Sequence, residues 1–119
     1  MPPDSANVPF KCSIAPWLSV RSSAEAIDFY KSAFGLSVNG AEFWLSDESP
    51  EHANFSPQSL GGGTVRMILT VTDPDAVFAR TLAAGARLVV AVEEAHGWRL
   101  GRVVDPFGHH WEIGRPLVA

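Results

Sequence analysis

His110 and Glu112 are the residues whose types and spacing most directly suggest chemistry, because they lie two apart in a run that favours a strand. Side chains at positions i and i+2 of a strand project from the same face. There they can contact a ligand together, and Glu112 can act as a general base. They can also supply two ligands to a divalent ion, although two donors from one strand make a poor metal cage.

Aromatic side chains provide a second set of candidates, since the chain has four tryptophans and seven phenylalanines. Such residues build cores, and they also line pockets for small molecules. We expect Trp17, Trp44 and Trp98 to stack on or enclose a ligand. Arg66 would then meet an anionic or carbonyl oxygen of that ligand.

Composition excludes several classes of partner. The formal net charge is −4 and the nine lysines and arginines are scattered, which argues against nucleic acid. Apolar runs such as 88–92 are too short to span a membrane, and residues 1–7 carry no apolar secretion signal. Cys12 is the only cysteine, so an internal disulfide is excluded and a reducing, cytoplasmic location is expected.

A strand–helix unit occurs twice in the sequence. Residues 16–20 favour a strand, Ser22 can cap a helix that follows, and Gly35 can end it. Residues 67–71 repeat the strand, Asp73 and Pro74 repeat the helix start, and Gly85 repeats the stop. The chain therefore contains two copies of one unit, offset by 50 residues when the two glycines are aligned.

Further strands are expected after each helix. In the first copy, residues 36–38 and 41–45 flank Asn39-Gly40, a strong hairpin signal. In the second copy, strands at 87–92 and 99–104 precede a turn at 105–108 and a closing strand at 109–114. Residues 49–63 are rich in proline and glycine and read as the linker between the copies.

Strand alternation separates an apolar face from a mixed one. The apolar set should lie beneath the helices: Pro16, Leu18, Val20, Phe43, Leu45, Met67, Leu69, Val71, Trp111 and Ile113. The mixed set suits the inner wall of a cup: Ala15, Trp17, Ser19, Glu42, Trp44, Ser46, Arg66, Ile68, Thr70, His110, Glu112 and Gly114. His109 alternates onto the helix side and is expected to be a structural histidine.

Three motifs together resemble the vicinal-oxygen-chelate superfamily, which includes glyoxalases, bleomycin-resistance proteins and extradiol dioxygenases. The run Asp105-Pro106-Phe107-Gly108-His109, followed by Trp111 and Glu112, resembles the last hairpin of that superfamily. Residues 26–35 resemble its first helix, and residues 73–86 resemble its second. The Phe-Gly-His turn and the loop 56–62 are similar to the PhnB-like subgroup.

The resemblance implies one α+β domain over residues 1–119. Its paired βαβββ modules would form a curled mixed sheet, or cup, with the helices on the outer face. Module one spans about residues 8–48, the linker 49–63, and module two about 64–116. The first module is apparently shortened after Gly35. Either a strand is truly deleted there, or a disordered segment is absent from this sequence.

The resemblance also implies where a metal would bind. The family's four ligand positions fall here on Ala15, Trp44, Arg66 and Glu112, of which only Glu112 is a ligand type. An arginine at the site would repel a cation, so no metal site is predicted. The family geometry brings Arg66 and Glu112 together, so Glu112 is expected either to pair with Arg66 or to be a solvated carboxylate on the strand.

The favoured hypothesis is a glyoxalase/bleomycin-resistance-like protein of uncertain activity that binds a small molecule in an aromatic cup without metal or other cofactor. One alternative is a metal-dependent glyoxalase-like lyase or isomerase, or an extradiol-type dioxygenase, with a divalent ion near His110 and Glu112. A further alternative is a metal-free enzyme with Glu112 as general base. A homodimer is expected, because a shortened first module leaves a strand edge unpaired.

Overall fold

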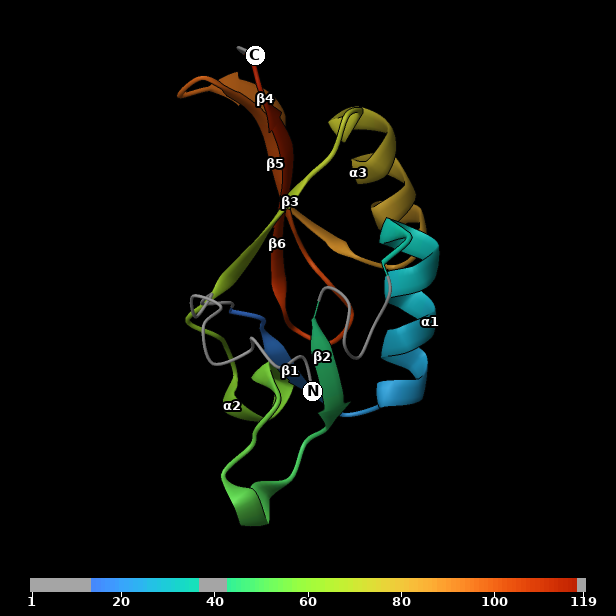
Figure 1. Ribbon diagram of the computed structural model, residues 1–119, viewed down its shortest axis with the longest axis vertical. Helices are drawn as coiled ribbons and strands as arrows, with labels where there is room; N and C mark the ends of the chain where they lie inside the picture. Colours follow the sequence, from blue (N-terminus) through green and yellow to red (C-terminus); the bar gives the residue numbers. More distant parts are fainter. Residues whose placement is uncertain (1–13, 37–42, 118–119) are drawn as a thin grey trace, which may run out of the picture.

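The computed structural model describes residues 14–36 and 43–117. They form an α+β arrangement in which the strands belong to two sheets and the two long helices lie together on one side (Figure 1). The two-stranded sheet has the order β1-β2, and the four-stranded sheet has the order β3-β6-β5-β4. The α+β class predicted from the sequence is confirmed.

The first module consists of β1 (Trp17–Val20), α1 (Ser23–Phe34) and β2 (Trp44–Asp47). Helix α1 begins where the Ser22 side chain accepts a hydrogen bond from the Glu25 amide, and it ends at Gly35, whose φ is 68°. Strand β2 runs parallel to β1, with Trp17 opposite Trp44 and Leu18 opposite Leu45.

The linker between the modules has two short helical turns, a 3₁₀ turn at Pro50–His52 and α2 at Pro57–Leu60. The second module follows with β3 (Arg66–Thr70), α3 (Pro74–Ala83), β4 (Arg87–Ala95), β5 (Trp98–Val104) and β6 (His110–Pro116). Asp73 caps α3 through the Ala76 amide. Strand β3 runs parallel to β6, whereas β5 is antiparallel to both β6 and β4. Strand β4 carries two register shifts, between Leu88 and Val90 and between Val90 and Glu93.

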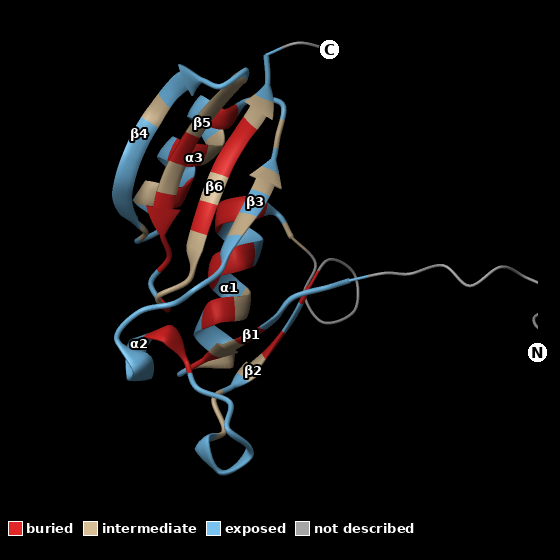
Figure 2. Cartoon of the chain, turned by 90° about the vertical axis from the view of Figure 1, so that its left-hand side faces the viewer, coloured by how far each residue is buried: buried red, intermediate tan, exposed pale blue. Residues whose placement is uncertain are grey.

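One face of the four-stranded sheet packs against the helices, and the other face is open (Figure 2). Gly101 of β5 lies under α3, because a Cβ added there would stand 2.5 Å from the ring of Phe78. The open face carries, in cross-strand register, Arg66, His110, Val104 and Arg87 in one row and Ile68, Glu112, Arg102 and Val90 in the next.

The hydrophobic core joins the two modules. Phe29, Tyr30 and Phe34 of α1 contact the rings of Phe107 and Trp111 from the second module. The predicted helix-facing set is buried or packs against this core, except for Pro16, which is exposed because it precedes β1.

The structure differs from the expected elements in several places, and the closing strand predicted at residues 109–114 lies at His110–Pro116. The strand predicted at residues 41–45 lies at Trp44–Asp47 and pairs in parallel with β1, while residues 37–42, with Asn39-Gly40, lie outside the described part of the chain. The strand predicted at residues 67–71 begins and ends one residue earlier. Strand β4 extends to Ala95 because its pairing with β5 continues as far as Trp98. No helix in the described residues is long and apolar enough to cross a membrane.

Candidate functional site

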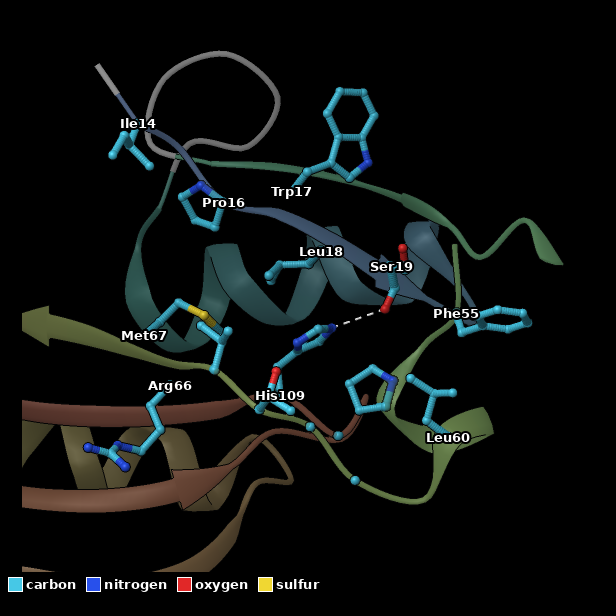
Figure 3. Close-up of a pocket in the computed structure, with 16 residues that line it drawn as sticks. Ile14, Pro16, Trp17, Leu18, Ser19, Phe55, Leu60, Arg66, Met67 and His109 are labelled. Atoms are coloured by element: carbon cyan, nitrogen blue, oxygen red, sulfur yellow. Dashed lines mark hydrogen bonds between the residues drawn. The ribbon is translucent and has the colours of Figure 1, made fainter. Parts of the chain in front are cut away.

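A pocket of about 630 Å³ lies where β1, the linker and the start of β3 meet (Figure 3), and we call it the junction pocket. Its walls are mainly apolar: Ile14, Pro16, Trp17, Leu18, Phe55, Pro57, Leu60, Val65 and Met67. Gly62, Gly63 and Gly108 add backbone surface, and Ser19, Thr64, Arg66 and His109 add polar groups. This volume and this mixture are typical of sites for small organic molecules.

His109 joins the two modules at the pocket wall. Its backbone amide donates to Asp105 Oδ1 at 2.9 Å, and its ring Nε2 lies 3.0 Å from the backbone oxygen of Ser19 on β1. The structural role predicted for this histidine is therefore confirmed. The ring also lines the junction pocket, which strand alternation did not predict.

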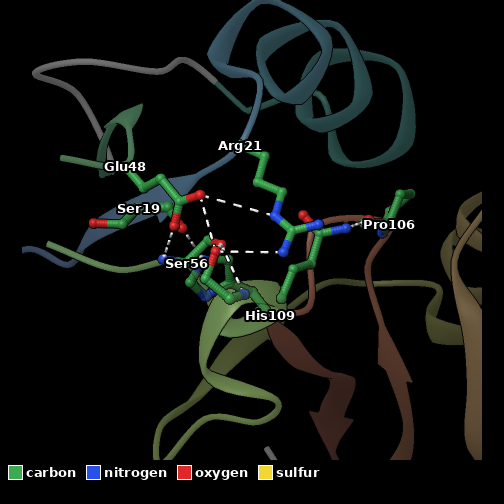
Figure 4. A network of polar contacts seen from close by, with 8 residues as sticks. Ser19, Arg21, Glu48, Ser56, Pro106 and His109 are labelled. Atoms are coloured by element: carbon green, nitrogen blue, oxygen red, sulfur yellow. Dashed lines mark hydrogen bonds and ion pairs between the residues drawn. The ribbon is translucent and has the colours of Figure 1, made fainter. Parts of the chain in front are cut away.

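The linker wall of the pocket is held in place by Glu48 (Figure 4). Its carboxylate accepts hydrogen bonds from the Ser56 amide at 2.9 Å and the Ser59 hydroxyl at 2.9 Å, and Arg21 lies 3.8 Å away. The Ser56 amide, and then the Ser59 hydroxyl, lower the pKa of Glu48. Glu48 therefore stays ionised, and it fixes the segment that carries Phe55 and Leu60.

Arg66 and Glu112 form an ion pair, one of the two arrangements expected for Glu112, with Arg66 Nε 2.7 Å from Glu112 Oε2. The pair is only partly sheltered, since the Arg66 side chain is 55% exposed and that of Glu112 is 17% exposed. Arg66 lines the junction pocket, whereas Glu112 lines a second pocket of about 290 Å³ on the open face. The pair therefore stands between the two pockets.

His110 lies beside this pair and is engaged by Arg102. Both Nε and Nη2 of Arg102 approach His110 Nδ1, at 3.3 and 3.1 Å. A guanidinium only donates, so Nδ1 accepts and the proton of the neutral ring lies on Nε2. Burial, and then the charges of Arg102 and Arg87, lower the pKa of His110.

The three tryptophans named as ligand-binding candidates do not share one site. Trp17 and Trp44 are stacked with ring centroids 5.5 Å apart, and the Trp17 indole donates to Ser46 Oγ at 2.9 Å. Trp17 lines the junction pocket, whereas Trp98 lines the pocket on the open face. They separate because Trp17 and Trp44 belong to the two-stranded sheet, and Trp98 belongs to the far end of the four-stranded one.

A buried carboxylate, Asp105, anchors the hairpin that presents His109 and His110. It accepts hydrogen bonds from the Tyr30 hydroxyl, from Trp111 Nε1 at 2.9 Å, and from the amides of Phe107 and His109. Burial, and then the charge of Asp105, raise the pKa of Tyr30. We call this group the Asp105 centre, and it ties α1 of the first module to the turn of the second.

The donor set near His110 and Glu112 does not fit a divalent ion. Arg102 occupies the Nδ1 of His110, and Arg66 occupies one oxygen of Glu112, so each candidate ligand already faces a cation. Within residues 14–36 and 43–117, no three His, Cys, Asp or Glu side chains gather to hold a metal.

Sequence reasoning missed the linker side of the junction pocket. Phe55 and Leu60 are exposed apolar residues in the linker, and Val65 is an exposed apolar residue directly before β3. These apolar residues were the feature of the sequence that could have predicted the pocket wall, because a linker that packs against nothing is usually polar.

The described residues form two α+β modules that share a core, with a largely apolar pocket at their junction. A family model described as a glyoxalase-like domain matches residues 17–114. The chain belongs to this glyoxalase-like family, within the vicinal-oxygen-chelate superfamily.

An individual relative covers nearly the whole chain. An uncharacterized protein of Mycobacterium tuberculosis is 39% identical over 136 residues, covering 96% of this chain and 80% of the relative. That alignment is longer than the 119 residues of this chain, so the relative has residues that this chain lacks.

Solved structures share the fold. A glyoxalase/bleomycin resistance protein/dioxygenase family enzyme from Burkholderia phytofirmans superposes with a TM-score of 0.71 at 16% identity, over 89% of this chain and all of that one. An antibiotic binding protein from a Streptomyces species superposes with a TM-score of 0.63 at 21% identity, over 89% of this chain and 97% of that one.

Proposed function

We propose that this protein binds a small, largely apolar organic molecule in the junction pocket, without a metal ion. The observation that carries the proposal is the pocket itself: about 630 Å³, with apolar walls and a few polar groups at its edge. Trp17 offers an aromatic surface that is 62% exposed, and it is held by its stack on Trp44 and its hydrogen bond to Ser46.

Arg66 supplies the polar end of this pocket. Its Nε is taken by Glu112, but no described group accepts from its two terminal nitrogens. A guanidinium fixed on one edge can donate from the other edge to an anionic or carbonyl oxygen. That one protein of this fold from Streptomyces is described as antibiotic binding is consistent with a role in ligand capture.

The proposal can be tested with 2-methoxynaphthalene, a neutral aromatic probe, in a ¹H–¹⁵N NMR titration. We expect the amide signals of Ser19, Thr64 and Val65 to shift in a saturable way. Gly62→Leu should weaken this binding at least about tenfold, because Gly62 lines the pocket and has open space for a side chain. Ala24→Leu on the exposed side of α1 is the matched control and should change nothing. Shifts spread evenly over the surface, or equal binding to Gly62→Leu, would refute the proposal.

The absence of a metal is part of the proposal and has its own test. Elemental analysis of protein purified without chelators should find far less than one transition metal ion per chain. Arg66 and Arg102, which face the only candidate ligands named above, are the support for this expectation. One ion per chain retained through gel filtration would favour the metal-dependent lyase, isomerase or dioxygenase.

We also propose that the protein is a cytoplasmic homodimer. The open face exposes apolar side chains, of which Ile68 is 65% exposed, and the two described strands of the first module make a small sheet. The single cysteine fits a reducing compartment. Light scattering at micromolar concentration should give the mass of two chains, and a monomer at all concentrations would overturn the dimer. Closer kinship with the PhnB-like subgroup stays a prediction.

A further inference from the structure

His109 has one ring nitrogen that the fold uses and one that it leaves open. The ring Nε2 lies 3.0 Å from the backbone oxygen of Ser19. A carbonyl oxygen only accepts, so Nε2 must carry a proton. In the neutral imidazole the other nitrogen, Nδ1, is then a lone-pair acceptor.

Nothing in residues 14–36 and 43–117 satisfies that acceptor. No described group donates to Nδ1, and the described residues contain no buried side-chain nitrogen or oxygen without a partner. Nδ1 is therefore accessible to solvent. His109 lines the junction pocket, and Figure 3 shows its ring among the pocket residues with Nε2 turned toward Ser19. A molecule in the pocket would meet the other edge of the ring, which carries Nδ1.

The ring is also rigidly placed. Asp105 holds the backbone amide of His109, and Ser19 holds Nε2, so both ends of the residue are fixed. The preceding Gly108 packs tightly against the linker, since a Cβ there would stand 2.8 Å from Pro57 Cβ. A fixed acceptor costs little to organise when a ligand binds, and it therefore discriminates well between ligands.

We infer that His109 selects an aromatic ligand that presents a hydroxyl or N–H donor to Nδ1. This rests on the proposed function, because it assumes that the junction pocket is the binding site. Among the other pocket residues, the side chains of Leu18 and Phe55 carry no hydrogen-bond groups, and the Met67 thioether is only a weak acceptor. A ligand without a donor would leave the lone pair of Nδ1 dehydrated and unpaired, which costs binding energy.

The first test needs no ligand. Long-range ¹H–¹⁵N spectra of the imidazole rings distinguish the two neutral tautomers. At about pH 8, where neutral imidazole is the usual form, we expect a protonated Nε2 and an unprotonated Nδ1 for His109. A protonated Nδ1 would overturn the inference, whatever the pocket binds.

The second test compares 2-naphthol with 2-methoxynaphthalene, which have the same aromatic body but differ in the hydroxyl donor. We expect 2-naphthol to bind about fivefold more tightly, the factor for one ordinary hydrogen bond, and to shift the Nδ1 signal. Equal affinities would overturn the inference while leaving the proposed function intact. If neither probe shifts the pocket amides, the proposed function fails instead.

His109→Phe keeps a flat ring but removes the acceptor. The preference for 2-naphthol should disappear in this variant, whereas binding of 2-methoxynaphthalene should persist. His52→Phe is the matched control, because His52 is an exposed linker residue outside the pocket, and it should keep the preference. If His109→Phe fails to fold, the tautomer and the preference of the wild-type protein still decide the question.

Discussion

Helix α1 of the first module buries Phe29, Tyr30 and Phe34, whereas α3 of the second module buries Phe78 as its only large aromatic side chain. The sheets show the opposite imbalance, since the described part of the first module has two strands and the second has four. The aromatic face of α1 therefore packs against Phe107 and Trp111 of the second module. A module with a small sheet is stabilised here by the core of its neighbour, so the two copies do not fold as independent units.

The Asp105 centre is the polar counterpart of this shared core. Substitution Asp105→Ala should lower the free energy of unfolding by about 4 kcal/mol or more, because four donors lose their acceptor in a buried place. Urea denaturation measures the loss. Asp75→Ala is the control, since Asp75 pairs with Arg99 at the surface, and it should matter far less. Similar effects of the two changes would mean that the junction does not depend on Asp105.

The packing of α3 against the four-stranded sheet can be tested at Gly101. Gly101→Ala should destabilise the protein by about 1–3 kcal/mol, because the new methyl group overlaps the Phe78 ring and Val92. Gly62→Ala has open space around it and should stay within about 0.5 kcal/mol of wild type. Thermal and urea unfolding would report both values. A neutral Gly101→Ala would show that α3 packs loosely on its own sheet.

The open face should depend much less on its charges than the junction does. Since Arg66 is more than half exposed, Arg66→Met and Glu112→Gln should each cost at most about 1 kcal/mol, with a coupling energy below that value. A double-mutant cycle by urea denaturation measures the coupling. A coupling energy of about 3 kcal/mol would mean that this pair contributes to stability as a buried ion pair does.

The smallest effect is expected for the titration of His110. Arg102→Met should raise the pKa of His110 toward its ordinary value, because one opposing cation is removed while burial remains. NMR pH titration of the ring measures this shift. A folded pKa below the unfolded one means that the unfolded chain binds the proton first, so stability falls as pH drops below about 6.5. Arg102→Met should make that loss shallower, and an unchanged His110 pKa would show that the charge of Arg102 does not contribute to it.

Local signals in the sequence predicted much of the fold. The caps at Ser22 and Asp73 and the stop at Gly35 are set by nearby backbone chemistry, and all three are confirmed. Strand alternation separated the core residues from the open face. These features depend on residues close in sequence or on a simple period, whereas the Arg66–Glu112 pair joins residues 46 apart and followed from the geometry that the family resemblance implied.

Features that depend on distant contacts were not predicted. The parallel pairing of β2 with β1 and the hydrogen bond from Tyr30 to Asp105 join segments far apart in the chain. The sequence predicted one aromatic cup, whereas the structure has two pockets lined by different tryptophans, because Trp17 and Trp98 lie on separate sheets. The acceptor Nδ1 of His109 could be identified only from the structure, which shows that Nε2 contacts the backbone oxygen of Ser19.

The two register shifts of β4 bear on how this protein avoids aggregation. Strand β4 is the outer strand of its sheet, and residues 88–92 are a continuous apolar run on it. A straight outer strand of that kind is a template for uncontrolled strand pairing between chains, and bulges twist such an edge away from a flat partner. The irregular pairing at Val90 breaks the regular ladder along this edge, which makes β4 a poorer template for a second chain.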